Sequence, residues 1–276
     1  MGMLTFQLRA SYAFVERNFN LIKRYWTWEM VWLIYTAAES LSVSFIGLGM
    51  GALSGGAVAL DTSYLVLYLL IGNMVWRFLS QIFYWITELI QVERWEGTIE
   101  YTLMAPIHRM THMFGQTLFS VLYSLVFTGV LLIVTALVFD IDLSGANIFG
   151  GTMMLLAGSF SFIGISIMAS VFPLLFPERG AQMTHVFIAV LLLVSGVYYP
   201  VEVLPGLLRE LAVYSPATYV LIGARGALLE GTPTLQLWPY IWPVLLMGAA
   251  LIPLGLWTFA QAERYAKRTG KLHRNG

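Results

Sequence analysis

The sequence predicts an all-α integral membrane protein with six membrane-spanning helices. Hydrophobic residues make up 58% of the 276 residues and charged residues only 11%, whereas globular domains contain about 45–50% apolar and 25% charged residues. Long apolar runs recur along the chain, and several reach the roughly twenty residues that an α-helix needs to cross a bilayer. The charged residues are concentrated between these runs, where membrane helices meet water.

The composition also limits what the chain can bind. Its formal net charge is zero, which gives no reason to expect a nucleic-acid partner. It has no cysteine, which excludes disulfides, thioether-linked haem and thiolate metal sites. His108 and His112 have helical i, i+4 spacing but no third ligand nearby, so we expect no metal site. No Ser/His/Asp set or carboxylate pair is arranged for catalysis, and we therefore expect the chain not to be an enzyme.

The N-terminal residues 4–30 interleave aromatic and basic side chains. This pattern is typical of an amphipathic helix in the membrane interface, with aromatic residues toward lipid and basic residues toward headgroups. No uninterrupted apolar core precedes a small-residue cleavage site, so we expect the segment to be retained. A soluble leader helix is the alternative interpretation.

The six spanning segments follow this interfacial helix. They are predicted at residues 31–53, 64–90, 113–138, 148–171, 183–198 and 237–259. The fifth has only about fifteen residues, fewer than a crossing requires. It ends at Tyr198, Tyr199 and Pro200, where irregular backbone must be buried in protein or line a wet cavity. We expect these three residues to form an outer gate; simple anchoring of the tyrosines at the headgroups is the alternative.

Residues 199–229 are predicted to form an extracellular re-entrant region between the fifth and sixth helices. They contain two weakly amphipathic pieces, divided at Ser215 and Pro216. Both pieces are too polar to span, so we expect them to dip back into the outer leaflet.

Three charged residues lie inside predicted spans: Glu39, Arg77 and Glu88. A charge near the middle of a span costs on the order of 2.5–3.5 kcal/mol on insertion scales, so each should face protein, a partner charge or water. Glu39 and Arg77 either pair and brace the first two helices or line a substrate route, and the sequence leaves both interpretations open.

The most densely acidic segment, residues 91–106, separates the second and third spans. Its charged residues are Glu93, Arg94, Glu96 and Glu100. Gly97 is a poor helix former and Thr98 can cap a new turn, so we expect a bend between them. Pro106 ends the segment. We expect a short polar helix on a membrane face; a solvated loop is the alternative.

The basic residues predict the orientation. With the N-terminus inside, all fifteen basic residues except Arg77, Arg209 and Arg225 lie in cytoplasmic segments. The positive-inside rule therefore places both termini and residues 91–106 in the cytoplasm.

Two motifs resemble those of the permease subunits of ABC-2 type transporters. The first follows the second spanning helix and consists of Glu93, Glu96-Gly97-Thr98, Glu100, Leu103 and Ala105-Pro106. The second lies between the last two helices and consists of Tyr199-Pro200, Leu204-Pro205, Ser215-Pro216-Ala217-Thr218-Tyr219 and Arg225. Ser215 stands where Asn is commoner in the family, and Ser can also cap a turn.

The resemblance implies a single ABC-2 type transmembrane domain over residues 1–276. It implies that residues 91–106 are a cytoplasmic coupling helix that docks on a separate ABC ATPase, which would be present in two copies and bind ATP and Mg²⁺. The coupling residues would be Glu93, Arg94, Glu96, Gly97, Thr98, Glu100 and Pro106. The permease would form a homodimer, or pair with a homologous permease, in the inner (cytoplasmic) membrane. Its implied cargo is a hydrophobic drug or antibiotic, a lipid, or a lipid-linked glycan, moved outward.

The chain itself carries no nucleotide-binding motif. It lacks a G-x-x-x-x-G-K-[ST] phosphate loop, and Leu53-Ser54-Gly55-Gly56 is followed by alanine where the LSGGQ signature has glutamine. We therefore expect no cofactor on this chain. The alternatives are a secondary transporter, which usually shows repeated broken helices, a channel, which needs no docking helix, and a membrane-embedded enzyme, which needs a convergent polar cluster.

Overall fold

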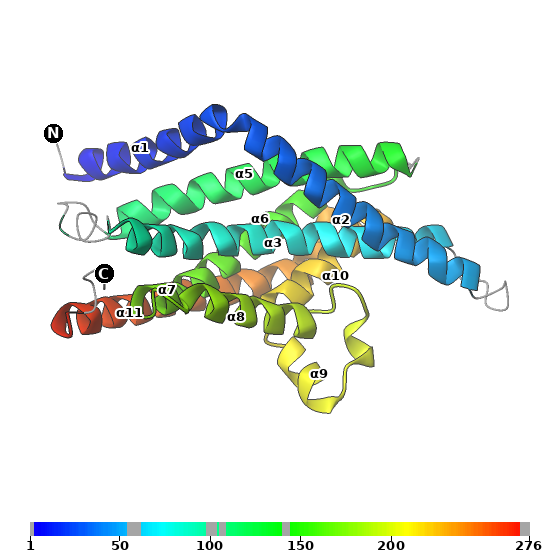
Figure 1. Ribbon diagram of the computed structural model, residues 1–276. Coiled ribbons are helices and arrows are strands. Elements are labelled where there is room, and N and C mark those ends of the chain that lie inside the picture. Colours follow the sequence, from blue (N-terminus) through cyan, green and yellow to red (C-terminus); the bar gives the residue numbers. More distant parts are fainter. Residues whose placement is uncertain (1–2, 54–61, 98–103, 105–108, 140–143, 271–276) are drawn as a thin grey trace.

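The computed structural model describes residues 3–53, 62–97, 104, 109–139 and 144–270, and every regular element within these ranges is helical. Figure 1 shows long helices side by side. The long helices are α1 (Met3–Arg24), α2 (Trp26–Leu53), α3 (Thr62–Glu96), α5 (Arg109–Val138), α6 (Ile148–Ala169) and α11 (Trp238–Arg268). The shorter elements are α7 (Val171–Leu175), α8 (Gly180–Val194), η1 (Val201–Val203), α9 (Gly206–Ala212), α10 (Pro216–Leu229) and η2 (Thr234–Leu237), where η marks a 3₁₀-helix. Of these, α7 and α8 lie along the long helices, and α9 projects from the bundle.

Five helical stretches are long and apolar enough to cross a membrane. They are Trp26–Met50, Ser63–Trp95, Met113–Val138, Ile148–Leu175 and Thr234–Arg268. These stretches overlap the predicted first, second, third, fourth and sixth spans. The predicted fifth span corresponds to α8, which is apolar but has only 15 residues. Five full-length helices and one short apolar helix therefore match the six predicted segments.

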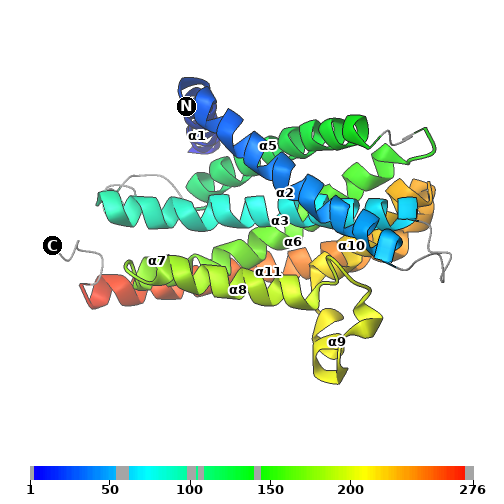
Figure 2. The same ribbon diagram turned by 45° about the vertical axis from the view of Figure 1, so that its right-hand side comes forward.

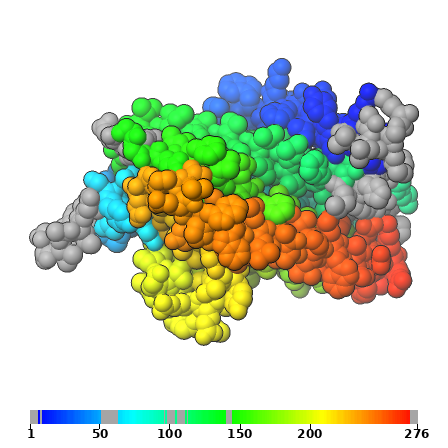
Figure 3. Space-filling view, turned by 180° about the vertical axis from the view of Figure 1, so that it is seen from behind, coloured from blue at the N-terminus to red at the C-terminus, as the bar shows by residue number. Residues whose placement is uncertain are grey.

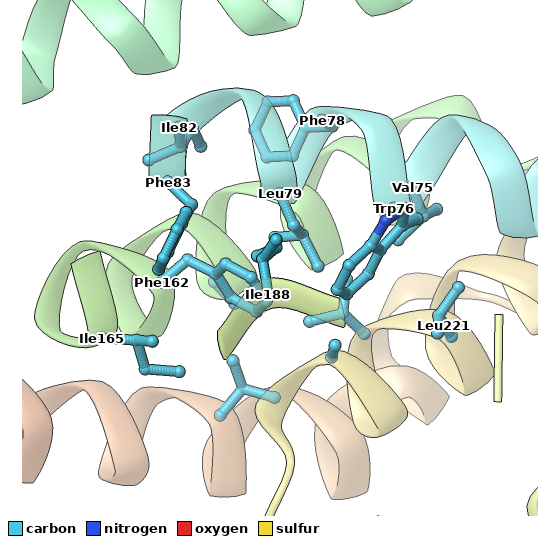
Figure 4. Close-up of a cluster of buried hydrophobic side chains, with 14 of the residues drawn as sticks. Val75, Trp76, Phe78, Leu79, Ile82, Phe83, Phe162, Ile165, Ile188 and Leu221 are labelled. Carbon is cyan, nitrogen blue, oxygen red and sulfur yellow. The ribbon is translucent and has the colours of Figure 1, made fainter. Parts of the chain in front are cut away.

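The central helix of the bundle is α3. Within its apolar window 72% of residues are buried, against 22% in the windows of α2, α5 and α11. Leu79 and Phe83 of α3 are fully buried in the hydrophobic core cluster. Figure 4 shows this cluster, in which α3 faces Phe162 of α6, Ile188 of α8 and Leu221 of α10. Because close-packed interiors transmit displacement, a shift of α3 must be felt by all three of these helices.

The N-terminal helix α1 lies on the outside of the bundle and packs against α5 (Figure 2). The Asn18 amide donates to Gln116 Oε1 at 2.7 Å, and the Ser11 hydroxyl donates to the carbonyl of Thr111 at 3.2 Å. A Cβ at Gly115 would lie 2.7 Å from the carbonyl oxygen of Ser11, so the glycine allows this close approach.

The first spanning helix begins earlier than the sequence predicted. The predicted interfacial segment, residues 4–30, is divided in the structure: α1 ends at Arg24 and α2 begins at Trp26. Neither Gly nor Pro occurs between Trp26 and Val31 to stop the new helix. The Tyr123 hydroxyl donates to the Glu29 carboxylate, so this charge has a partner inside the protein.

Glycines bring α6 and α11 together. A Cβ at Gly164 would lie 2.6 Å from the carbonyl carbon of Leu251, and one at Gly255 would lie 2.7 Å from the carbonyl oxygen of Gly164. Small residues are the usual means of close helix packing in membranes, where apolar surface alone gives little driving force. The Ser161 hydroxyl adds a bond to the carbonyl of Val244 at 2.5 Å.

Two helices follow the short fifth segment, as predicted, and they differ in their surroundings. Figure 3 shows α9 in a lobe that projects from the bundle, and its residues Leu207 and Leu211 are exposed. By contrast, α10 packs against α3, α6 and α11, and Val220, Leu221 and Ala224 are buried. The exposed apolar surface expected of an interfacial piece is therefore found mainly on α9.

Candidate functional site

The polar segment after the second span is partly a continuation of that span. α3 runs without a break to Glu96, so a separate helix beginning at residue 91 was a wrong prediction. Gly97 then ends α3 with φ of +71°, in the left-handed region that favours glycine. The predicted bend therefore begins at this glycine. Thr98, Glu100 and Pro106 lie outside the described residues.

The end of α3 is fixed to the chain that follows α7. The Gln91 amide donates to the carbonyl of Pro177 at 2.7 Å, and the Trp95 indole N–H donates to the same oxygen at 3.2 Å. Trp95 is nevertheless 63% exposed and Val92 is 47% exposed. Trp95 and Val92 were not predicted as contact residues, because the prediction rested on the charged residues of this segment.

Glu93 does not lie on an open acidic face, as the sequence analysis expected. Its side chain is only 7% exposed and that of Arg94 only 5%, and both are engaged with other residues. The helical period turns positions 93 and 94 toward the bundle when 92 and 95 face outward. Glu96 is the last residue of α3, and its side chain lies outside the described part.

Glu39 and Arg77 contact each other, which agrees with the first of the two interpretations that the sequence left open. Arg77 Nη1 lies 3.5 Å from Glu39 Oε2, and Arg77 Nη2 donates to the Thr36 hydroxyl at 2.6 Å. These contacts join α2 to α3. The Glu39 side chain is 42% exposed and the Arg77 side chain is 24% exposed. The pair thus braces two helices and still presents charge at the bundle surface.

We predict that this pair is energetically coupled. Glu39→Gln or Arg77→Gln alone leaves an uncompensated charge, so each should lower the melting temperature more than the isosteric change itself would. In the double variant the loss should be smaller than the sum of the two, by a coupling of about 0.5–3 kcal/mol. Thermal unfolding of the four proteins in one detergent measures this, and strict additivity would contradict it.

A polar stripe runs along α3 from this pair in both directions. It consists of Asn73, Arg77, Tyr84 and Glu88, whose spacing of four, seven and four places them on one helical face. Tyr84 contacts His185 of α8, with 3.3 Å between the hydroxyl and Nδ1, and Glu88 is exposed. The stripe was only partly predicted, because the prediction considered the charged residues in the spans and not the uncharged Asn73 and Tyr84.

The predicted outer gate residues, Tyr198, Tyr199 and Pro200, follow shortly after α8, which ends at Val194. Gly196 has φ of +71° and turns the chain. The Tyr198 hydroxyl donates to Asn73 Oδ1 at 3.1 Å, and the Tyr199 hydroxyl donates back to the carbonyl of Leu193 at 2.6 Å. The segment leading to Pro200 is therefore attached both to α8 and to the polar stripe of α3.

Arg225 of α10 holds this outer segment from the other side, and we call the arrangement the Arg225 clamp. Its Nη1 donates to the carbonyl of Gly196 at 3.0 Å and its Nη2 to that of Val197 at 2.6 Å. The guanidinium lies 3.6 Å from the centre of the Tyr68 ring of α3. Arg225 is 8% exposed, and this burial lowers its pKa, a shift opposed by the charge interaction with Tyr68. Its ordinary pKa is so high that the group stays charged.

Gly72 makes the Arg225 clamp sterically possible. A Cβ at this position would lie 2.1 Å from the carbonyl oxygen of Val197 and 2.5 Å from Arg225 Nη2. Such distances are far below van der Waals contact, so any side chain here would displace the clamp or α3. The sequence analysis noted Arg225 only as part of a motif and did not connect it with Gly72.

No metal site can be built from the part of the chain that the structure describes. No group of three His, Cys, Asp or Glu residues there is close enough to share an ion. His108 lies outside the described residues, and nothing is known of the His112 side chain.

Comparison with known proteins gives the family. The family model for the ABC-2 type transporter matches residues 10–229, a range that contains the end of α3, the polar stripe, the outer gate and the Arg225 clamp. No curated protein matches the chain. Because the family model covers well over half of the sequence, which the apolar helices mark as a multi-pass membrane protein, the chain belongs to the ABC-2 type transporter family, a family of transmembrane permeases.

Proposed function

We propose that this permease is the membrane subunit of an ATP-driven exporter. The observation that carries the proposal is the continuity of α3, a single 35-residue helix. At 1.5 Å per residue it extends about 52 Å, and it joins the Gly97 end to the polar stripe and the Arg225 clamp. A force applied at Gly97 can therefore reach the outer gate through one rigid element.

The force would come from a separate ABC ATPase in two copies, with ATP and Mg²⁺ bound on that partner and none on this chain. Residues 91–106 would form its docking segment, with Trp95 and Val92 added to the predicted residues because they are exposed at the end of α3. The permease would act as a homodimer or with a homologous permease. Its single transmembrane domain would have α1 in the interface and residues 199–229 as a re-entrant outer region.

The substrate route would follow the polar stripe of α3. Arg77 and Glu39 keep exposed surface beside it, and Glu88 is exposed further along. Since charges are costly in lipid, these residues are expected to face a second permease subunit or a wet path between subunits. ATP-driven closure of the partner would tilt α3 and open this route to the outer leaflet. A hydrophobic drug or antibiotic, a lipid, or a lipid-linked glycan would be exported in this way.

Orientation in the inner membrane gives a direct prediction. One end of the bundle contains the first residues of α1 and the last residues of α3 and α11. The helices α9 and α10 lie at the opposite end (Figure 1). With the first end cytoplasmic, Glu210→Cys on α9 should react with a membrane-impermeant maleimide on intact cells. Arg264→Cys on α11 should react only after the membrane is permeabilised. Both positions are exposed, and the natural chain has no cysteine to interfere. The reverse labelling would contradict the orientation.

Partner dependence tests the function itself. The tagged permease, purified from its native membrane in mild detergent, should carry an ABC ATPase in equal amount. In proteoliposomes, the complex should hydrolyse ATP in a vanadate-sensitive way, and removal of the ATPase should abolish transport. A permease that purifies alone and moves its substrate down an ion gradient would instead be a secondary transporter, and one that passes ions without any gradient coupling would be a channel.

A further inference from the structure

A cavity opens beside the outer gate and the Arg225 clamp. It has a volume of about 490 Å³ and is walled by α3, the segment after α8, α10 and the start of α11. Side chains from distant parts of the chain meet there. The four aromatic residues in its wall are tyrosines, namely Tyr64, Tyr68, Tyr199 and Tyr240. The cavity is thus an aromatic-lined chamber at the outer end of the bundle, and it is separate from the polar stripe of α3.

The charges in the wall of the cavity do not balance. Glu202 of η1 and Glu230 after α10 both line it, both are exposed, and neither forms an ion pair in the part of the chain that the structure describes. Arg225 is the cation among the lining residues, but its two terminal nitrogens are already bound to backbone carbonyls. The chamber therefore has an excess of negative charge beside its tyrosine rings.

A buried hydroxyl at the cavity wall also lacks a partner. Thr218 is 6% exposed and its Oγ1 has no hydrogen-bond partner. Buried polar groups are nearly always satisfied, so this hydroxyl is available to a ligand in the cavity. Its oxygen takes no part in the contacts of the outer gate or of the Arg225 clamp, and it can accept a bond from a hydroxyl or N–H group on a ligand.

We propose that this outer chamber binds the alkylammonium group of an organic cation. Aromatic faces attract ammonium groups through the ring quadrupole. Tyr64, Tyr199 and Tyr240 supply such rings, since the face of Tyr68 already carries Arg225. The carboxylates of Glu202 and Glu230 add attraction that a neutral ligand would not feel. A sugar carries no charge, and the excess of negative charge among the described lining residues favours a cation over such a neutral ligand. The ammonium group could belong to a transported amine or to a lipid headgroup of the outer leaflet.

The test uses choline and its uncharged isostere, 3,3-dimethylbutan-1-ol, on the purified permease without any ATPase, so that its result stands apart from the proposed transport. The micelle should be a neutral polyoxyethylene detergent, which contains neither amine nor sugar. Saturation-transfer NMR should show binding of choline and at least about tenfold weaker binding of the alcohol. Added salt should weaken choline binding, because the carboxylates are exposed.

A double variant and a matched control test whether the two carboxylates form the binding site. Glu202→Gln with Glu230→Gln keeps the shape of both side chains and should raise the dissociation constant for choline about tenfold. Glu210→Gln, on exposed α9 and outside the cavity wall, is the matched control and should leave it unchanged. Melting temperatures of the three proteins show whether each folds normally.

Competition separates the two sources of the ammonium group. Phosphatidylcholine added to the micelle should displace choline if the chamber takes headgroups, and phosphatidylglycerol should not. Displacement by neither lipid assigns the chamber to a soluble or transported amine. Equal binding of choline and the alcohol, tighter binding of methyl glucoside, or unchanged affinity in the double variant would each overturn the proposal.

Discussion

Replacement of Arg225 by methionine is expected to free the outer gate segment from α3 and to lower the melting temperature by on the order of 5–10 °C. Methionine keeps most of the packing volume against Tyr68 but cannot donate to the carbonyls of Gly196 and Val197, which Arg225 holds at 3.0 and 2.6 Å. Two buried acceptors would then be left without partners, and each costs about 1–3 kcal/mol.

Arg225→Lys should be nearly as harmful, although it keeps the charge. One ammonium group cannot reproduce the planar fork that reaches two carbonyls while stacked on an aromatic ring. Gly72→Ala should disrupt the same clamp from the side of α3, because its Cβ would lie 2.1 Å from the carbonyl oxygen of Val197. All three variants should therefore lose stability together.

Arg209→Met is the control, since this arginine is exposed on α9 and has no role in the clamp. Differential scanning fluorimetry in one detergent compares the four variants with the natural protein. If Arg225→Met unfolds at the same temperature as Arg209→Met, the clamp contributes nothing and the close contact at Gly72 must be explained by packing alone.

The Arg225 clamp is a feature that the sequence alone does not predict. Hydropathy located the spans because each long apolar run has one physical explanation, and the cost of burying charge linked Glu39 with Arg77 before any contact was seen. The clamp instead joins Tyr68 and Gly72 to Arg225, residues more than 150 positions apart in sequence. Nothing in local composition indicates which carbonyls an arginine will find.

The end of α3 illustrates a second kind of error. A run of charges was taken as a solvated, separate helix, but α3 continues through it and turns Glu93 inward, to 7% exposure. Whether a residue faces the bundle or the surroundings is not set by its own charge. It is set by its position in the helical repeat relative to the buried residues of the same helix. Gly97 was located correctly because its backbone freedom is a property of the residue itself.

Gly97→Val is expected to uncouple ATP hydrolysis from transport while leaving the permease folded. Gly97 has φ of +71°, and no atom of the described residues lies within 4 Å of a Cβ built there. A larger side chain therefore meets no clash with this part of the chain, and we attribute the expected effect to the backbone. A β-branched residue is a strong outlier in the left-handed region, whereas Asn enters it readily.

The two substitutions at Gly97 should consequently behave differently despite similar size. In Gly97→Val the chain must leave α3 in another direction, so the segment that follows no longer presents the same surface to the ATPase. Gly97→Asn should keep the exit direction and the coupling. We prefer this pair to charge reversal at Glu93, because that side chain is buried and its reversal would damage the fold.

The measurement is the stimulation of ATP hydrolysis by transported substrate in the complex reconstituted into proteoliposomes. We expect at least about a tenfold loss of stimulation in Gly97→Val, equivalent to a coupling free energy of about 1.4 kcal/mol or more, and less than a twofold change in Gly97→Asn. Melting temperatures of the two isolated permeases should agree closely, since α3 is complete before residue 97. Full stimulation in the valine variant would mean that force does not enter α3 through this turn, and an equal loss in both variants would point to the side chain rather than to the backbone.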